Sequence, residues 1–278
     1  MDNLYRNTSL EISKVVTNRY STSFSIGIHL LSKSIRAKIY AIYGFVRLAD
    51  EIVDTFDGYN QREIFDNFKA QYQRALENRI STNPVLNAYQ EVAHEYELYE
   101  LTETFLKSME MDLEQQLYTN SIDYTDYIHG SAEVVGLMCL RVFVENDEER
   151  YHQLLPYAKV LGSAFQKVNF LRDIGHDWEA LGRSYFPMLE HAQLNDQNKV
   201  YILNDIKAEL DLALEGIKQL PLNCRLGVYI AYKYYLALWQ KLKSKTAAQI
   251  IDERTRISSV RKVLLLKNNA LRHYMGLL

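Results

Sequence analysis

Residues 41–57 read AIYGFVRLADEIVDTFD, and this stretch decides the fold class. On a helical wheel, at about 100° per residue, its apolar side chains form one continuous stripe. The stripe consists of Ile42, Phe45, Val46, Ala49, Ile52, Val53 and Phe56. A stripe of that width must face a protein core, so the stretch predicts an amphipathic helix packed in a bundle.

Polar side chains follow one flank of this stripe, namely Tyr43, Arg47, Asp50 and Asp54. The two aspartates are one turn apart, about 6 Å along the axis, and like charges at this spacing destabilise a bare helix by a few tenths of a kcal/mol. In a helical protein an isolated D-x-x-x-D is more often a solvated acidic face. The alternative is a pair that binds a hard cation such as Mg²⁺, which takes oxygen ligands and is usually shared with phosphates.

Residues 161–178 carry a second polar line, which consists of Gly162, Gln166, Asn169, Asp173 and Asp177. Phe165 and Phe170 lie beside it on the wheel, and Arg172 lies close by. The line covers about 12 Å from its asparagine to its last aspartate, enough to touch more than one ion. Its glycine either leaves space for a bulky ligand or allows a close helix crossing. Two such lines fit a site in which metal ions bridge opposed carboxylates and clamp a diphosphate.

The rest of the chain is also expected to be helical. Eleven Gly and four Pro are too few to punctuate many hairpins or βα units, while helix-forming residues are plentiful. Nothing in the 278 residues marks a seam, so we predict one all-α domain over residues 1–278, with a central cavity. Apolar positions recur at helical spacing over residues 4–19, 33–56, 61–78, 84–94, 98–118, 124–144, 147–178, 198–217, 223–245 and 256–275.

The charge and the cysteines of the chain limit which partners it could bind and indicate its cellular compartment. With 32 basic and 35 acidic residues, the net charge of −3 provides no field to recruit nucleic acid, so any anion site must be local. The N-terminus lacks a signal-peptide apolar region and no stretch approaches the ~20 apolar residues of a membrane span. Cys139 and Cys224 lie far apart in apolar surroundings, which indicates reduced core residues of a cytoplasmic protein.

Five motifs occur in the order typical of one family. Tyr43–Asp54 matches "Y-x-x-x-R-x-x-D-[DE]-x-x-D", and Gln166–Asp177 matches "Q-x-x-N-x-x-R-D-x-x-x-D". Three further elements are similar to "S-x-S-F", "Y-x-Y-x-v-A-g-x-V-G-x-m" and "G-R-x-Y-x-P", at Tyr20–Ser25, Tyr127–Met138 and Leu181–Pro187. Through these motifs the chain resembles the squalene/phytoene synthase family from Ser21 to about Lys262. The resemblance implies an isoprenoid-synthase-type helical bundle.

The resemblance also implies roles for individual residues. The implied metal ligands are Asp50, Asp54, Asn169, Asp173 and Asp177. The implied substrate-binding residues are Tyr20, Ser21, Ser23, Phe24, Tyr43, Arg47, Gln166, Arg172 and Arg183. Tyr235 falls at the family's late tyrosine position near the second substrate, and with the four aspartates it completes the implied catalytic set. Arg261 and Lys262 resemble the basic end of the family's last helix, or are ordinary C-terminal helix charge.

Members of the family join two identical prenyl diphosphates head to head through a cyclopropylcarbinyl diphosphate, using Mg²⁺, for which Mn²⁺ can substitute. The last cation is then quenched by proton loss or by hydride from NADPH. Because the chain has no G-x-G-x-x-G fingerprint, we expect proton loss and no NADPH. The sequences GRSYFP and SAEVVGLM are more similar to bacterial phytoene synthases than to dehydrosqualene synthases, which favours two geranylgeranyl diphosphates, the product phytoene and a role in carotenoid biosynthesis.

A dehydrosqualene or squalene synthase that uses farnesyl diphosphate stays an alternative. The length of the prenyl chain that is accepted depends on side chains at the floor of the active-site cavity, and the sequence does not locate them. His129 stands where the family often has tyrosine, and Glu133 where it has glycine. The histidine could donate a hydrogen bond, act as a base, or be an ordinary core residue. Lipid substrates imply a hydrophobic exit, and hence peripheral association with the inner face of the membrane. The sequence leaves the oligomeric state open.

Two other classes of function are weighed. A non-catalytic assembly factor of this family would typically lose aspartates, whereas all four outer ones are present. A di-metal carboxylate bundle needs two Glu-x-x-His pairs, which the chain has at Glu91–His94 and Glu149–His152. The second pair follows a polar run, so an exposed helix start is favoured over a buried ligand pair.

Overall fold

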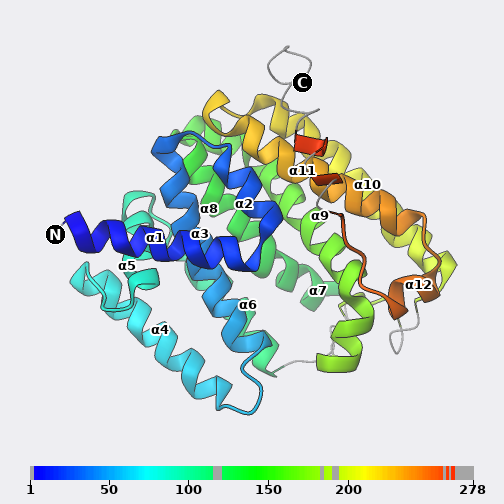
Figure 1. Cartoon of the computed structure of the whole chain (residues 1–278), viewed down its shortest axis with the longest axis horizontal. Helices are drawn as coiled ribbons and strands as arrows, with labels where there is room; N and C mark the ends of the chain where they lie inside the picture. The colour runs from blue at the N-terminus through cyan, green and yellow to red at the C-terminus, as the bar shows by residue number, and fades with distance from the viewer. Residues whose placement is uncertain are drawn as a thin grey trace.

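The computed structural model describes residues 3–114, 121–181, 185–189, 194–258, 261–262 and 264–266, and within these ranges it contains helices and no strands (Figure 1). The predicted all-α class is confirmed. The helices are α1 (Asn3–Tyr20), α2 (Thr22–His29), α3 (Lys33–Asp54), α4 (Gln61–Asn78), α5 (Pro84–Glu95), α6 (Tyr99–Glu114), α7 (Ser121–Ile128), the π-helical turn η1 (His129–Glu133), α8 (Val134–Phe143), α9 (Glu148–Leu181), α10 (Asp196–Gln219), α11 (Leu222–Lys243) and α12 (Ala247–Asp252).

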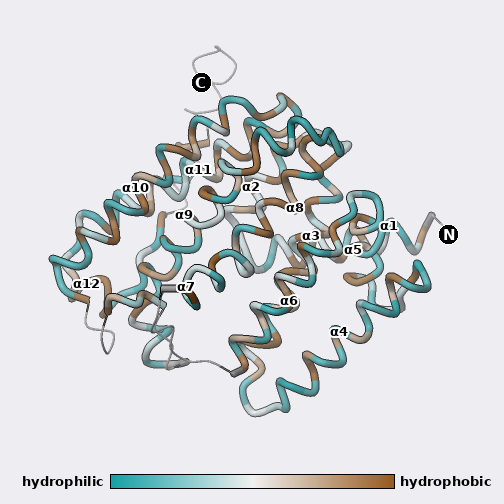
Figure 2. Tube along the Cα trace, turned by 180° about the vertical axis from the view of Figure 1, so that it is seen from behind, coloured by the Kyte–Doolittle hydropathy of each residue, from teal (hydrophilic) through white to brown (hydrophobic). Residues whose placement is uncertain are grey.

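Two long helices carry the two polar lines, and α8 packs against both of them. Helix α9, of 34 residues, also contacts η1, α10, α11 and α12, while α3 also contacts α1, α4, α5 and α6. Helix α2 packs on α11. Figure 2 shows hydrophobic and hydrophilic residues alternating along the helices, as amphipathic helices in a bundle require. Within the described part of the chain, no helix combines the length and apolar character needed to cross a bilayer.

The apolar stripe of α3 is buried as predicted. Ile42, Phe45, Ala49, Ile52 and Val53 are each at most 3% exposed, and the rest of the stripe packs against the same core. The ring of Phe45 stacks on that of Tyr89 from α5, with centroids 3.9 Å apart and planes 11° apart. Burying one such side chain stabilises the fold by roughly 1.5–3 kcal/mol. The stripe therefore fixes which flank of α3 turns away from the core, and with it the position of Asp50.

Helices α9 and α10 pack antiparallel, in a register set by two contacts. The Lys167 ammonium, on α9, lies 2.6 Å from Asp205 Oδ2 and 2.8 Å from Glu209 Oε1, both on α10. Ten residues earlier on α9, Tyr157 lies against Gly216, where an added Cβ would be 2.2 Å from the tyrosine Cβ. No residue larger than glycine fits that crossing without displacing a helix. The two helices are thus held at a fixed spacing along much of their length.

The structure departs from the expected helices in two places. Helix α2 was not predicted, because eight residues rich in Ser and Gly carry too short a periodic signal. A helix was predicted over residues 256–275, but 254–258 are non-helical and only short pieces beyond them fall within the described ranges. The short helix α12 precedes this segment instead, and it begins with a capping box between Thr246 and Gln249. The segment 253–258 is called the strap below.

Replacing Lys167 with methionine should destabilise the fold by about 1–3 kcal/mol, because the Glu209 side chain, which is 20% exposed, and the half-exposed Asp205 would lose their common cation. Urea unfolding followed by circular dichroism measures the change. Lys207→Met is the matched control, since Lys207 pairs with Asp211 on the same helix at 2.6 Å in an exposed position. That variant should change stability by no more than about 0.5 kcal/mol. Equal effects of the two substitutions would contradict the role given to the buried ion pair.

Candidate active site

A cavity of about 940 Å³ lies between α2, α3, η1, α8, α9, α10, α11 and the strap. On three of these helices the lining side chains change from apolar to polar toward the C-terminal end. They run from Ile39 to Asp50 on α3, from Leu154 to Arg172 on α9, and from Gly227 to Tyr235 on α11. All three polar ends meet at one mouth. The cavity is therefore an apolar pocket with a polar mouth.

The α3 side of the mouth carries three of the predicted residues. Tyr43, Arg47 and Asp50 line the cavity one turn apart, as the helical wheel predicts. The Arg47 guanidinium bonds to Glu51, lies 3.7 Å from an Asp50 oxygen, and stacks 4.5 Å from the ring centroid of Tyr20. Its charge is thus shared between two carboxylates and an aromatic ring.

Negative charge is concentrated on this side. Burial in the wall, followed by the nearby charge of Asp54, raises the pKa of Asp50 to about 8, and Arg47 offsets this only in part. Asp112 on α6 adds to the same effect. Sequence reasoning missed Asp112, which is 8% exposed and accepts a 2.7 Å hydrogen bond from the Tyr127 hydroxyl. In the sequence it alternates with Glu110 and Glu114 along one helix, so no pattern set it apart from an ordinary acidic face.

The α9 side is balanced differently. Asp173 accepts hydrogen bonds from Arg172 Nε at 2.8 Å, and from Arg254 Nε and Nη2 at 2.7 and 3.0 Å. Burial alone would favour protonation, but the two guanidinium groups outweigh it and lower the pKa of Asp173. Arg254 belongs to the strap and lines the cavity, although no sequence motif pointed to it. Asp177 lies one turn further along α9, 3.7 Å from His176 Nδ1.

Aromatic rings lie directly under the polar mouth. The Tyr235 ring stacks on Phe165 with centroids 3.8 Å apart, and Phe24 lies 5.9 Å from it. The Tyr235 hydroxyl donates to Asn169 Oδ1 at 3.3 Å, and burial raises the pKa of Tyr235. The neighbouring Tyr232 instead packs beside Tyr229. Tyr235 thus contacts both the aromatic rings below the mouth and Asn169, a predicted metal ligand, which supports its assignment to the family's late tyrosine position.

The N-terminus of α2 also reaches the mouth. Tyr20, Ser21, Ser23 and Phe24 line it, and the Ser21 side chain caps α2 by accepting the Phe24 N–H at 3.1 Å. The positive end of the helix dipole, with its unpaired N–H groups, favours an anion there.

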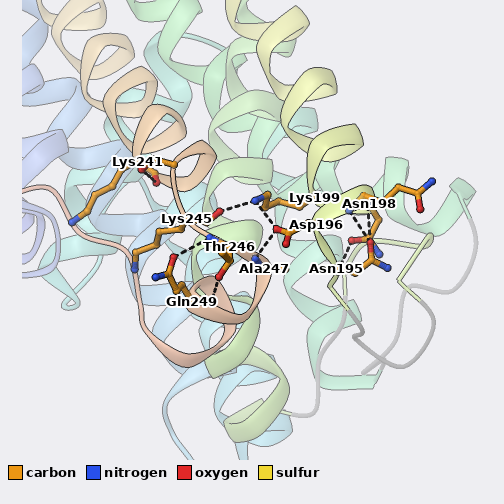
Figure 3. Close-up of polar contacts among 11 residues, drawn as sticks. Asn195, Asp196, Asn198, Lys199, Lys241, Lys245, Thr246, Ala247 and Gln249 are labelled. Carbon is orange, nitrogen blue, oxygen red and sulfur yellow. Dashed lines mark hydrogen bonds and ion pairs between the residues drawn. The ribbon is translucent and has the colours of Figure 1, made fainter.

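The strap is tied down on both sides of Arg254. Lys241 Nζ donates to the carbonyl oxygen of Arg256 at 2.8 Å. Upstream, Lys199 bonds Asp196 Oδ1 at 2.8 Å and the Lys245 carbonyl oxygen at 2.6 Å, and the same aspartate oxygen accepts the N–H of Ala247, the first residue of α12 (Figure 3). This network joins the start of α10 to the turn between α11 and α12. It fixes the point from which the strap crosses to the mouth.

The structure gathers most of the predicted residues. Those that line the cavity are Tyr20, Ser21, Ser23, Phe24, Tyr43, Arg47, Asp50, Gln166, Asn169, Arg172 and Tyr235. Asp54, Asp173 and Asp177 lie outside this lining at the rim, and Arg183 lies outside the described residues. Within the described ranges, no three His, Cys, Asp or Glu side chains form a ready metal-binding group. The oxygen donors could hold Mg²⁺ in its usual manner, through one or two carboxylates, waters and substrate phosphates.

The structure bears on two residues whose roles the sequence left open, His129 and Gly162. His129 Nδ1 lies 2.7 Å from Glu133 Oε2 within the π-helical turn, and neither residue lines the cavity. A Cβ on Gly162 would be 2.8 Å from the Ala132 carbonyl oxygen, so a close crossing of α9 and η1 accounts for this glycine.

The di-metal alternative is not supported. Both ring nitrogens of His94 are hydrogen-bonded, to the Tyr99 hydroxyl at 2.6 Å and to the Leu76 carbonyl oxygen at 3.0 Å. Glu91 pairs with Arg6. The second pair is exposed, since the His152 side chain is 72% accessible. These residues do not converge on a common site.

Comparison with known proteins finds similarity to one family and to two of its members. The squalene/phytoene synthase family model matches residues 17–261. A phytoene synthase from Rhodobacter capsulatus is 28% identical over 285 residues, covering 94% of this chain and 81% of that protein. A 4,4'-diapophytoene synthase from Staphylococcus haemolyticus is 28% identical over 196 residues, covering 68% of this chain and 65% of that protein.

The fold is shared with solved structures. A dehydrosqualene synthase crystallised with a ligand has a TM-score of 0.81 at 21% identity, and the match covers 97% of this chain and 98% of that one. A squalene synthase from Alicyclobacillus acidocaldarius has a TM-score of 0.74, also at 21% identity, over 86% and 95% of the two chains. The predicted isoprenoid-synthase-type bundle is confirmed.

The raised pKa of Asp50 predicts a pH dependence of stability in metal-free solution. The folded state holds this proton more tightly than the unfolded state, whose aspartate titrates near 3.8. The contribution is therefore complete below about pH 4 and is lost as the pH rises through about 8. Urea unfolding in EDTA should show this fall in the wild-type protein but not in Asp50→Asn. Parallel pH profiles for the two proteins would contradict the assignment, and Asp66→Asn on exposed α4 serves as the control.

Proposed function

The chain belongs to the squalene/phytoene synthase family, and from this premise we propose that it is a phytoene synthase. It condenses two geranylgeranyl diphosphates head to head, through a cyclopropylcarbinyl diphosphate, with Mg²⁺ and without NADPH. The observation that carries the proposal is the cavity itself, whose mouth is lined by Arg47, Arg172 and Arg254 and opens into a deep apolar pocket.

The mouth suits departure of a diphosphate. Asp50, Asn169 and Asp173, with the other rim aspartates close by, would hold Mg²⁺, which would supply Lewis-acid neutralisation of the diphosphate charge. Arg172 and Arg254 already lie at the rim with their guanidinium groups directed at Asp173. Both guanidinium groups would be able to donate to the leaving group, whose negative charge grows as the C–O bond breaks.

The aromatic rings beneath suit the carbocation that remains. Phe165, Tyr235 and Phe24 form a cluster of rings that lines the cavity, and an aromatic ring face attracts positive charge electrostatically. The apolar walls exclude water, which would otherwise trap the cation as an alcohol. The cation can then alkylate the double bond of the second prenyl chain in the same pocket. We propose that the reaction ends when the last carbocation loses a proton.

The depth of the cavity supports the C20 substrate. Below Gln166 the α9 wall continues to Leu154, which is about 18 Å at 1.5 Å per residue. With C–C bonds of about 1.5 Å, a five-carbon unit extends roughly 5 Å, so a C15 chain needs roughly 15 Å and a C20 chain roughly 20 Å. A C15 chain would leave the end of the pocket empty, whereas a slightly bent C20 chain fills it. The similarity to a diapophytoene synthase keeps farnesyl diphosphate as the second candidate.

Purified protein incubated with Mg²⁺ and geranylgeranyl or farnesyl diphosphate, with and without NADPH, should form a C40 hydrocarbon that needs no NADPH. Mass spectrometry of the extracted product measures it. A C30 product as the main outcome would favour the second candidate. No product from either substrate would favour a non-catalytic protein of this family.

Asp173→Asn should lower turnover about 100-fold or more, because it removes the carboxylate on which the metal and both arginines converge. The fold should persist, since Asp173 lies on a cavity rim and not in the core. Circular dichroism checks the fold, and steady-state kinetics checks the rate. Asp66→Asn, an exposed carboxylate paired with Lys69 on α4, is the control and should retain full activity. Wild-type rates in Asp173→Asn would rule out the proposed diphosphate site.

A further inference from the structure

The end of the cavity farthest from the mouth is built from large apolar side chains. Leu154 on α9 and Leu220 at the end of α10 line it and are 2% and 6% exposed. Gln153 donates to Gln219 Oε1 at 3.1 Å, which brings the two leucines level with one another across the helix pair. Phe143, at the end of α8, also lines this end. We call Leu154 and Leu220 the floor pair.

Small residues lead down to this pair on the α10 side. Along α10 the lining changes from Ala213 and Gly216 to Ile217 and Leu220 within two turns. Gly216 is also where α10 meets the Tyr157 side chain with no room for a Cβ, so the passage above the floor has a width set by the contact between that ring and the α10 backbone. Because protein interiors are close-packed, a larger side chain here would displace its neighbours or protrude into the cavity. The floor is consequently a fixed stop.

The height of the floor pair corresponds to one part of a prenyl chain. Measured from Gln166, Leu154 lies about 18 Å down α9. The third five-carbon unit of an extended chain ends near roughly 15 Å and the fourth near roughly 20 Å. The floor pair is thus level with the fourth unit, which only a C20 chain possesses. A C15 chain ends above it.

From this geometry we infer that Leu154 and Leu220 determine chain-length specificity, by contacting the terminal isoprene unit of a C20 prenyl diphosphate. The inference rests on the proposed function. It concerns a region remote from the diphosphate site, so bulk added at the floor should affect the C20 substrate and leave binding and ionisation of the C15 substrate intact.

Competition between geranylgeranyl and farnesyl diphosphate tests the inference, with the C40 and C30 products quantified together. Leu154→Phe and Leu220→Phe should lower kcat/KM for the C20 substrate about tenfold or more relative to the C15 substrate, because a hydrophobic pocket discriminates by this order per small group excluded. Leu154→Ala should move specificity in the opposite direction and improve use of a C25 diphosphate. Leu212→Phe, exposed on α10 and outside the cavity, is the control and should leave the ratio unchanged.

Each outcome decides one point. A wild-type protein that forms C40 product, with floor variants that keep its C40 to C30 ratio, would overturn the floor assignment alone. An equal fall for both substrates would also overturn it, because general overpacking explains that result. A wild-type protein inactive on both substrates would instead overturn the proposed function. Leu154→Ala keeps the test decisive if the larger side chains prevent folding.

Discussion

The constraint on which the site depends is the concentration of carboxylates on one flank of α3. Asp50 and Asp54 are four residues, about one turn, apart on a flank of the buried apolar stripe, so the fold cannot turn them toward solvent without exposing Phe45 and its neighbours. Asp112 approaches from α6. The single arginine of this flank is shared with Glu51. The resulting excess of negative charge is what a hard cation relieves.

The opposite wall has the complementary arrangement. On α9, Asp173 is held by two guanidinium groups, one from the adjacent residue and one from the strap. The α3 side of the mouth therefore has more carboxylates than cations, whereas on the α9 side two guanidinium groups balance Asp173. The proposed metal diphosphate complex would satisfy both sides at once, because the acidic flank favours a cation and the arginines favour an anion. Neither a bare cation nor a bare anion would do so.

The sequence predicted those parts of this arrangement that lie on single helices. The lines through Asp50 and through Asn169 follow directly from a 3.6-residue period, and the structure places both at the cavity. It could not predict Arg254, which reaches Asp173 across 81 positions of chain from a segment without helical structure. Asp112 escaped for the same reason, because its partner Tyr127 comes from another helix. Contacts between distant segments leave no period to detect.

Helix α9 also separates two properties that the reaction must combine. Its C-terminal part carries the polar groups proposed to assist ionisation, Gln166, Asn169 and Arg172, and its N-terminal part carries Leu154 at the floor. About 18 Å of helix lies between Gln166 and that floor, so a change in one part need not disturb the other. In the proposed function the motif residues assist departure of the diphosphate, while the length of the prenyl chain is decided where no motif lies. For this reason sequence similarity to both phytoene and diapophytoene synthases is compatible with one mechanism and two substrates.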